Sequence, residues 1–371
     1  MKSIIRKFFT RGLRSAGYSD YSAEVVFNAL WNDFFKEDRT TLSQKFWAYK
    51  RGFFSGRIPY FGLTEDNYRD YLSDFDFYRL HPINGPYSKW IDDKLTIRYI
   101  LHPYSNYLPE YYFHLYHHEI LRLADCPAAI ETTVEGTIQC LQAKGALTAK
   151  LVSGTKGAGF FKLAYQDEAY FINNRETSEG EVSGLISNWL DTGGVEYLIT
   201  EYVRENRDFN QFSDAAPGAL RLVVIRERNQ SPQLIYSFHH FATKKSGVLN
   251  TPGGVSCIVD VETGFFSNGK SHGKGELIDC KYHPDTGILL EGYLPHWGLI
   301  KEKIVEISRF IPQVIFMGYD LILTEDGFKI IEINSHPGTD YIQSCHPYMR
   351  AGAGKEFFTR LLQEKKAKPE K

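Results

Sequence analysis

The residues with the clearest chemical potential lie in the segment GYDLILTEDGFKIIEINSHPG. Two strand-like runs flank the turn EDG, and this pattern predicts a β-hairpin. Pairing outward from the turn sets Thr324 opposite Phe328 and, four pairs later, Asp320 opposite Glu332. Alternation along the second strand puts Asn334 on the same face as Glu332. The three oxygen-bearing side chains are therefore expected to converge at the open end of the hairpin.

This convergence predicts a metal site. Carboxylate and amide oxygens are ligands that Mg²⁺ prefers, and Mg²⁺ keeps open positions for water and phosphate oxygens. Two facing carboxylates repel each other unless a cation lies between them. We therefore predict that Asp320, Glu332 and Asn334 bind Mg²⁺, with Mn²⁺ as the alternative ion. The competing interpretation is a surface hairpin with solvated polar groups, which suits this apolar strand poorly.

A glycine-rich loop follows a strand that carries a lysine, in the segment AKLVSGTKGAGFFKL. Small residues let backbone N–H groups approach phosphate oxygens, and a lysine adds a point charge. Many hairpins also turn on Gly and Ser, so the loop alone is weak evidence. The candidate phosphate-binding residues are Lys150, Ser153, Gly154, Gly157 and Gly159.

A third segment, EYLITEYVRENRDF, reads as a strand that passes into a polar turn. Backbone groups at such a strand exit can read an adenine edge, and an acidic residue beyond it can accept hydrogen bonds from ribose hydroxyls. The alternative is a plain edge strand and its loop. The candidates are Glu201, Tyr202 and Val203 for the base and Asp208 for the ribose, with Glu205 as the alternative acid.

Further basic residues follow in the sequence. Arg221 lies in the otherwise apolar run GALRLVVIR, and a buried guanidinium needs an anion, either a phosphate or a structural carboxylate. Downstream, ATKKSGVLNTPGG contains Lys244 and Asn250 and ends in two glycines. This segment suits a substrate or γ-phosphate loop, or else a solvated turn. Arg221, Lys244 and Asn250 are the candidate catalytic residues.

Composition narrows the class of protein. The 371 residues carry a net charge of -2 and are 43% hydrophobic, which indicates a globular chain of two or three domains without a bias toward nucleic acid. The five cysteines are widely spaced and never form CxxC, so neither zinc nor a disulfide framework is expected. No apolar run reaches membrane-spanning length and no secretory signal is evident. We expect a cytoplasmic protein.

Residues 1–15 have a distinct character, since they contain five basic residues, no acidic residue and several large apolar ones. At helical spacing they form a basic amphipathic segment that could rest on an anionic membrane surface. The equally weighted alternative is a terminal helix docked on the body of the protein. A mitochondrial transit peptide is a weaker third interpretation.

The elements that must position these residues alternate in type along the chain. Residues 1–90 read as mostly helical, with a clear apolar spacing over 23–35, and a charged tail occupies 367–371. The class is α+β with largely antiparallel sheets. Helices are predicted at 132–144, 178–190, 298–312 and 354–366. Strands are predicted at 146–152, 159–165, 169–173, 195–203, 220–226, 234–243, 256–261, 319–324 and 328–334.

In this order the pieces resemble the ATP-grasp superfamily over about residues 145–345, and EIN-x-x-PG is the most specific match. The triplet at 92–94 resembles the "DK" opening that precedes ATP-grasp domains, and residues 49–110 resemble the sugar-transfer-associated and teichuronopeptide-synthesis branches. The chain departs from commoner members by having Leu151 where a proline usually follows the lysine. It also has a long helical N-terminus, and these departures leave the carboxylate-binding site open.

The resemblance implies a fold and residue roles. It implies two α+β subdomains that grip ATP, about 146–205 and 206–350 within a region 91–366, preceded by a helical extension over 1–90. Lys150 would touch the α- and β-phosphates under the closing glycine loop. Arg221 would lie near the transferred phosphate. The expected cofactors are ATP and Mg²⁺ held by the three hairpin residues.

The resemblance also implies an activity. We expect an ATP-dependent carboxylate–amine ligase that forms an amide through an acyl phosphate. Its expected partners are a small carboxylate, on a sugar or an amino acid, and an amine in cell-surface polysaccharide biosynthesis. One alternative is a kinase acting on a sugar hydroxyl. Another is a non-catalytic nucleotide-binding protein of an envelope-assembly pathway.

Overall fold

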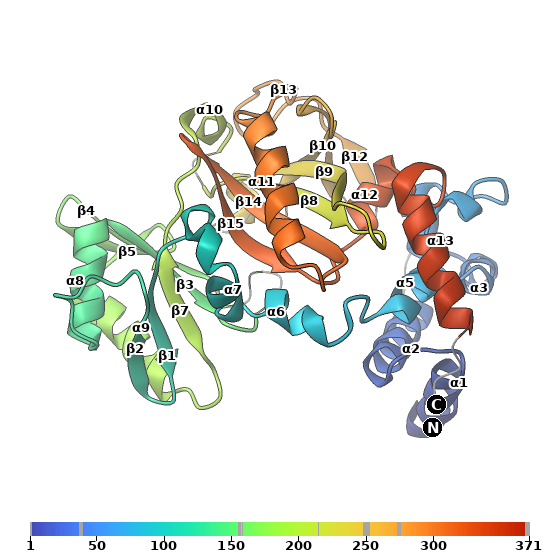
Figure 1. The fold of residues 1–371 in the computed structure, drawn as a ribbon, viewed down its shortest axis with the longest axis horizontal. Helices are drawn as coiled ribbons and strands as arrows, with labels where there is room; N and C mark the ends of the chain where they lie inside the picture. Colours follow the sequence, from blue (N-terminus) through green and yellow to red (C-terminus); the bar gives the residue numbers. More distant parts are fainter. Residues whose placement is uncertain are drawn as a thin grey trace.

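Two antiparallel sheets lie side by side in the computed structural model, and a group of helices lies beyond the larger sheet (Figure 1). The N- and C-termini come close together at this helical end, far from the smaller sheet. The structure describes residues 2–36, 40–154, 157, 159–213, 215–247, 253–272 and 276–367.

The smaller sheet has seven strands in the order β2-β1-β7-β3-β4-β5-β6. α8 (Val134–Lys144) and α9 (Glu179–Asp191) pack against it around a shared apolar core. Thr133 begins α8 by accepting a hydrogen bond from the N–H of Gly136 at 3.0 Å, as an N-cap residue does. The strands are β1 Tyr111–Tyr116, β2 Glu119–Arg122, β3 Ala146–Leu151, β4 Phe161–Gln166, β5 Ala169–Ile172, β6 Arg175–Thr177 and β7 Tyr197–Glu201.

The larger sheet follows the order β12-β11-β10-β9-β8-β14-β15, and β13 pairs with β11. Both faces of this sheet are covered. Neighbouring residues of a strand point to opposite faces, so they join different cores. Leu222 of β8 joins the core under α11 (Trp297–Phe310), whereas Val223 joins the core under α13 (Gly352–Ala367). The strands are β8 Ala219–Ile225, β9 Gln233–Phe241, β10 Val255–Val259, β11 Phe265–His272, β12 Leu277–Asp279, β13 Gly292–Tyr293, β14 Phe316–Thr324 and β15 Gly327–Asn334.

Helices build the N-terminal region and the connections. α1 packs on α2, where Arg6 Nε lies 2.6 Å from Glu24 Oε2. Asn84 fixes this region to the larger sheet, since its Nδ2 donates to the carbonyl of Phe316 at 2.7 Å. Within the described residues, no helix has both the length and the apolar character needed to cross a membrane. The helices are α1 Lys2–Ser15, α2 Asp20–Phe35, α3 Leu42–Lys50, α4 Arg57–Phe61, α5 Asp74–Leu80, α6 Lys89–Asp92, α7 Thr96–Ile100, α10 Arg207–Asn210 and α12 Asp340–Cys345, with 3₁₀ turns η1 Tyr68–Asp70, η2 Gly85–Ser88, η3 His102–Tyr107 and η4 Lys244–Ser246.

The expected α+β class with antiparallel sheets is confirmed. The four helices predicted after residue 130 are present as α8, α9, α11 and α13, with ends shifted by no more than two residues. Each predicted strand is also present within a few residues of its expected ends. The strands β1, β2, β6, β11, β12 and β13 lie outside the predicted runs. Several of these are short or polar strands, which carry little hydrophobic periodicity.

Candidate nucleotide and metal site

The two acidic residues of the hairpin face each other across β14 and β15. Asp320 is the register partner of Glu332, as the sequence pattern predicts. The predicted pairing of Thr324 with Phe328 is wrong, because the two-residue turn pairs Thr324 with Gly327 instead. A β-bulge at Ile331 restores the register before the acids are reached.

Asp320 is held by a guanidinium and an amide. Arg221 lies next to it across the β8–β14 ladder, and its Nη2 donates to Asp320 Oδ2 at 2.8 Å. Asn334 Nδ2 donates to the same oxygen at 3.1 Å. Burial alone would lower the pKa of Arg221, but the adjacent carboxylate keeps it above its ordinary value. Arg221 has therefore found the structural carboxylate that was one of its two expected partners.

Glu332 is held by a lysine that the candidate set did not include. Lys94 Nζ lies 3.0 Å from Glu332 Oε1 and 2.8 Å from the carbonyl oxygen of Gly154. Lys94 follows α6, so it connects the segment before the smaller sheet, the glycine loop and the hairpin acids. The DDK triplet was the sequence signal for this residue, although a triplet alone does not show which side chain it meets.

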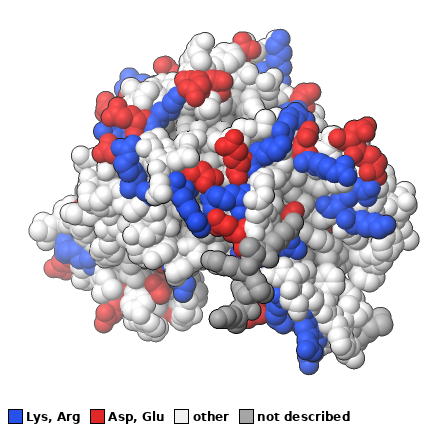
Figure 2. Space-filling view, turned by 45° about the vertical axis from the view of Figure 1, so that its right-hand side comes forward, with Lys and Arg blue, Asp and Glu red and all other residues white. Residues whose placement is uncertain are grey.

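Lys150 belongs to the same charged cluster. It lies on β3, with its Nζ 5.7 Å from the centroid of the Tyr111 ring. Burial lowers the pKa of Lys150 to about 8, the positive charge of Lys94 adds to this lowering, and Glu332 opposes it. Both sheets thus contribute to one cluster of two lysines, one arginine and two carboxylates. On the face seen in Figure 2, acidic and basic side chains likewise lie intermixed.

Asp92 ties the end of β15, which carries the predicted metal ligands Glu332 and Asn334, to α6. Its Oδ1 accepts a hydrogen bond from the N–H of Ser335, and its Oδ2 accepts one from the Ser335 hydroxyl, both at 2.7 Å. Ser335 directly follows Asn334, so this clamp fixes the direction in which β15 ends. Tyr111 adds a further tie, because its hydroxyl donates to the carbonyl of Lys94 at 3.0 Å. The DDK triplet drew attention to Asp92 without giving it a role, and sequence reasoning missed Tyr111 altogether.

The glycine loop is only partly described. Thr155, Lys156 and Ala158 lie outside the described residues. Gly159 has a φ of +68°, and a Cβ there would lie 2.6 Å from Leu151 Cγ, so a larger residue would be strained and crowded. Between β3 and β4 lie Ser153, Gly154 and Gly157. The carbonyl of Gly154 accepts a hydrogen bond from Lys94, which places this part of the loop beside the charged cluster.

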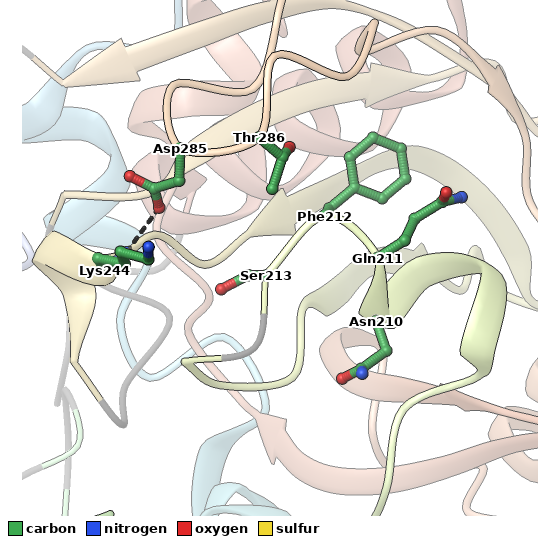
Figure 3. Close-up of a pocket in the computed structure, with 7 residues that line it drawn as sticks. All are labelled: Asn210, Gln211, Phe212, Ser213, Lys244, Asp285 and Thr286. Carbon is green, nitrogen blue, oxygen red and sulfur yellow. Dashed lines mark hydrogen bonds between the residues drawn. The ribbon is translucent and has the colours of Figure 1, made fainter.

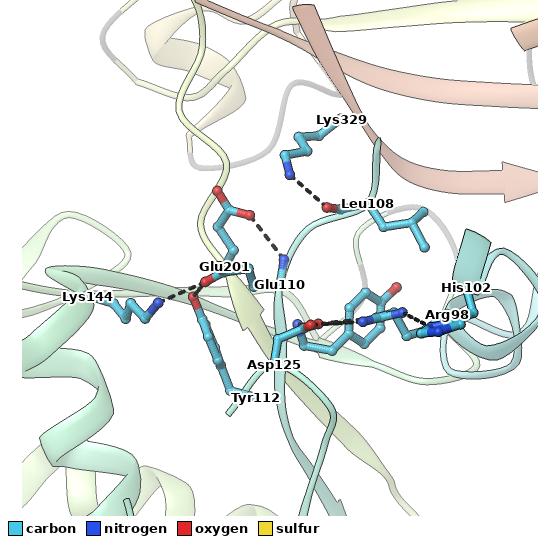
Figure 4. A network of polar contacts seen from close by, with 10 residues as sticks. Arg98, His102, Leu108, Glu110, Tyr112, Asp125, Lys144, Glu201 and Lys329 are labelled. Carbon is cyan, nitrogen blue, oxygen red and sulfur yellow. Dashed lines mark hydrogen bonds and ion pairs between the residues drawn. The ribbon is translucent and has the colours of Figure 1, made fainter. Parts of the chain in front are cut away.

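The predicted base-reading segment lies where the two halves of the molecule connect (Figure 4). The Glu201 carboxylate accepts a hydrogen bond from the N–H of Glu110 at 3.0 Å, and Lys144 Nζ lies 2.8 Å from Glu110 Oε2. Glu201 therefore secures β1 against β7. Tyr202 is half-buried with Lys162 Nζ 4.6 Å from its ring centroid, and Val203 is buried.

The two acids considered for the ribose have different surroundings. Asp208 is exposed on the short helix α10. Glu205 points into the protein, where its side chain is 3% exposed and its Oε1 lies 3.9 Å from Nε2 of His239. Burial raises the pKa of Glu205 to about 7, although the N–H of Gly218 opposes this. Asp208 is thus the better placed of the two for a bound molecule.

Lys244 lies in the 3₁₀ turn η4, which follows β9. Its backbone N–H donates to Asp285 Oδ2 at 2.7 Å, and together they border a pocket of about 220 Å³ (Figure 3). Phe212 supplies an apolar wall, and Asn210, Gln211, Ser213 and Thr286 complete the lining. Asn250, the third candidate catalytic residue, lies outside the described residues. The roles of Lys244 and Asn250 stay predictions.

The donor set of the hairpin suits Mg²⁺. Asp320 and Glu332 offer hard carboxylate oxygens, and Asn334 uses its Nδ2 rather than its carbonyl oxygen in the contact with Asp320. Among the described residues, no group of three or more His, Cys, Asp or Glu side chains is placed to hold a metal ion, so the predicted set relies on two carboxylates and the amide of Asn334. The cluster also contains the basic side chains of Lys94, Lys150 and Arg221, which could contact phosphate oxygens.

Two α+β halves meet at a junction that contains two lysines, and sequence comparison identifies the family. A family profile for sugar-transfer associated ATP-grasp proteins matches residues 80–346. Because this match spans most of the chain, the protein belongs to the sugar-transfer associated ATP-grasp family. No curated protein matches the sequence. ATP-grasp enzymes generally use ATP and Mg²⁺.

Several solved structures are similar to this chain. D-alanyl-alanine synthetase A from Vibrio cholerae is 12% identical with a TM-score of 0.44, over 75% of this chain and 66% of that one. N5-carboxyaminoimidazole ribonucleotide synthetase from Thermotoga maritima is 14% identical with a TM-score of 0.37, over 76% and 51%. Biotin carboxylase from Campylobacter jejuni is 10% identical with a TM-score of 0.39, over 75% and 47%. The chain therefore spans less than two thirds of each of these proteins.

Proposed function

We propose that this protein is an ATP-dependent carboxylate–amine ligase that forms an amide through an acyl phosphate. The observation that carries the proposal is the cluster at the junction of the two sheets, where Asp320 and Glu332 face each other between Arg221 and Lys94. A ligase of this kind must neutralise a nucleotide's phosphates on one side and hold a divalent cation on the other. The cluster offers groups for both tasks.

The chain's own residues would act mainly by positioning and charge stabilisation. Lys94 and Lys150 would bind the phosphates of ATP from the side of the glycine loop. Arg221 would stabilise the negative charge of the transferred phosphoryl group. Bound Mg²⁺, held by Asp320, Glu332 and Asn334, would supply further charge neutralisation. Closure of the 153–159 loop would keep water away from the acyl phosphate.

The bonds exchanged in the reaction define its products. A carboxylate oxygen of the acceptor attacks the γ-phosphorus while the bond from that phosphorus to ADP breaks. The amine then attacks the acyl carbon, forms the amide bond, and releases inorganic phosphate and a proton. No covalent intermediate with a protein side chain is needed, which agrees with a cluster built from charged groups.

The family supports a proposed acceptor class. Membership in the sugar-transfer associated ATP-grasp family favours a carboxylate on a sugar or an amino acid, joined to an amine in cell-surface polysaccharide biosynthesis. The pocket beside Lys244 has amide, hydroxyl, acidic and basic groups around one aromatic wall, and this mixture suits a polar metabolite.

Release of ADP in the presence of uronic acids, amino acids and a panel of amines tests the proposal. Adding hydroxylamine identifies the chemistry, because hydroxylamine traps an acyl phosphate as a hydroxamate and leaves a phosphate ester intact. Hydroxamate formation that depends on one carboxylate supports the ligase. A stable phosphorylated sugar without hydroxamate would instead establish a kinase.

The variant Glu332→Ala should abolish acceptor-dependent ADP formation, because it removes a carboxylate that the metal requires. We expect the rate of ADP formation to fall by at least about 1,000-fold, because the metal that Glu332 would hold acts on the phosphoryl group while it is transferred. Glu291→Ala, an exposed acid of the same half, is the matched control and should keep full activity. Full turnover by Glu332→Ala would refute the metal assignment. ATP binding by the wild-type protein without ADP release for any acceptor would favour a non-catalytic role.

A further inference from the structure

Exposed apolar side chains gather at the N-terminal end of the molecule. Among the described residues, eighteen large hydrophobic side chains are exposed, and nine of them precede residue 50. The most exposed aliphatic and phenylalanine side chains among these nine are between 60% and 73% exposed. These five side chains, the N-terminal apolar patch, are Ile4, Phe8, Phe35, Leu42 and Phe46.

Side-chain contacts link the three helices that carry the patch. Lys2 Nζ lies 5.2 Å from the ring centroid of Trp31, and Trp31 contacts Phe35 with 4.9 Å between centroids. The start of α1 therefore lies beside the end of α2. Phe34 of α2 contacts Phe46 of α3, with 6.3 Å between ring centroids. The helices α1, α2 and α3 thus lie together at the helical end of the molecule, far from the smaller sheet (Figure 1).

Basic side chains on α1 accompany the patch. Arg6 forms an ion pair with Glu24 of α2, but Lys7 and Arg11 are exposed and have no ion-pair partner in the part of the chain that the structure describes. Ile4, Lys7, Phe8 and Arg11 have the spacing i, i+3, i+4 and i+7, which places them on one helical face. This face presents apolar and cationic groups together and carries no acid.

Such a face matches the interface of an anionic bilayer. Apolar side chains can enter the boundary between headgroups and acyl chains, while lysine and arginine extend to the phosphate level. A protein partner would have to cover the same apolar area and also neutralise both cations. We propose that the N-terminal apolar patch docks this protein on an anionic lipid bilayer. The proposal is independent of the ligase reaction, since none of these residues belongs to the site cluster.

Vesicle flotation of the full chain tests the docking. We expect the wild-type protein to float with phosphatidylcholine vesicles that contain phosphatidylglycerol and not with phosphatidylcholine alone, and to be released by salt. The double variant Lys7→Gln/Arg11→Gln should bind roughly 30-fold more weakly, because two basic side chains near the surface are removed. The variant Ile4→Ser/Phe8→Ser should also fail to float. Both pairs are exposed, so the thermal midpoint should hardly change.

The matched control is Lys281→Gln/Arg175→Gln, which removes two exposed basic side chains elsewhere and should bind as the wild type does. Equal flotation of the wild type with neutral and anionic vesicles would overturn the proposal. So would unchanged binding of Lys7→Gln/Arg11→Gln. Self-association that Ile4→Ser/Phe8→Ser abolishes, without vesicle binding by the wild type, would show that the patch joins two copies of the chain instead.

Discussion

Lys94 is the residue that joins the parts of the site. Its ammonium group contacts Glu332 at 3.0 Å and the glycine loop at 2.8 Å, and its positive charge acts on Lys150. A divalent cation bound to Glu332 and the ammonium of Lys94 compete for the same carboxylate. Phosphate oxygens would offer Lys94 a new partner, so nucleotide and metal should bind more strongly together than separately.

Replacing Lys94 with Met should therefore affect metal and nucleotide in opposite directions. Without nucleotide, Mn²⁺ affinity measured by paramagnetic resonance should rise by about 3- to 10-fold, because a partly exposed competing cation is worth about 1 kcal/mol. ATP affinity should fall, because one phosphate contact is lost. Lys89→Met alters a nearby exposed lysine and should change neither affinity. Weaker Mn²⁺ binding by Lys94→Met would contradict the competition.

Lys150 carries a stability cost that its proposed role in binding phosphate explains. Burial lowers its pKa to about 8, from an ordinary value of 10.5. Because folding lowers its pKa, Lys150 binds its proton less tightly in the folded protein than in the unfolded chain. The free energy of unfolding should therefore increase as the pH rises from about 8 to about 10. Below that range the buried charge destabilises the fold in full.

The variant Lys150→Met should stabilise the protein at pH 7 in the absence of nucleotide. The expected gain in the free energy of unfolding is about 1–3 kcal/mol, and the gain should shrink at pH 10. Urea unfolding at both pH values measures it. The same variant should lose ATP affinity, which would show a group retained for function at the expense of stability. A destabilised variant at pH 7 would contradict the argument.

At the scale of elements, the end of β15 depends on a contact from a distant helix. Asp92 of α6 accepts two hydrogen bonds from Ser335, directly after the predicted metal ligand Asn334. A strand end without such a clamp would let the amide and the carboxylate of Glu332 move relative to Asp320. Preorganisation of these groups is what makes a charged site effective.

A double-mutant cycle on Asp92→Ala and Ser335→Ala measures the clamp. Asp92→Ala should weaken Mn²⁺-ATP binding by about 10- to 100-fold, because outer contacts of this kind orient metal ligands. Ser335→Ala keeps its backbone N–H and should cost less. The two effects should be non-additive, since both act through the same contact. Additive losses would show that Asp92 acts elsewhere.

The hairpin shows what sequence reasoning could and could not predict. Strand patterns and the turn EDG predicted the facing pair Asp320 and Glu332, because pairing of β-strands is local and periodic. The pattern did not reveal the bulge at Ile331, since this isoleucine looks like its neighbours. The intermediate pairing of Thr324 was therefore wrong although the functional pairing was right.

Contacts between distant segments were harder to predict. The pairing of Arg221 with an anion followed from burial, but the choice of Asp320 required the β8–β14 ladder. Lys94 lies 238 residues before Glu332 in the sequence, so periodicity has no bearing on their contact. Strands such as β1, which is buried along nearly its whole length, lacked the alternation that identifies a half-exposed strand.

At the scale of the whole molecule, one face of the smaller sheet has its own core under α8 and α9, whereas Tyr111 and Leu198 on its strands β1 and β7 join the core that centres on α11. One polar link between the halves is the hydrogen bond that Lys329 Nζ of β15 donates to the carbonyl of Leu108, which precedes β1, at 3.0 Å (Figure 4). Such an arrangement permits one half to move or unfold before the other.

A nucleotide bound by Lys150 on one side and Glu332 on the other should couple the two cores. Without nucleotide, calorimetry should show the smaller half unfolding in a separate or broadened transition. Saturating Mg²⁺-ATP, at about 100 times its dissociation constant, should add about 2.7 kcal/mol and merge the transitions, because unfolding either half then releases the ligand. Glu332→Ala should keep the broadened profile with Mg²⁺-ATP present. A single unchanged transition under all conditions would mean that the halves already unfold together and that the site does not bridge them.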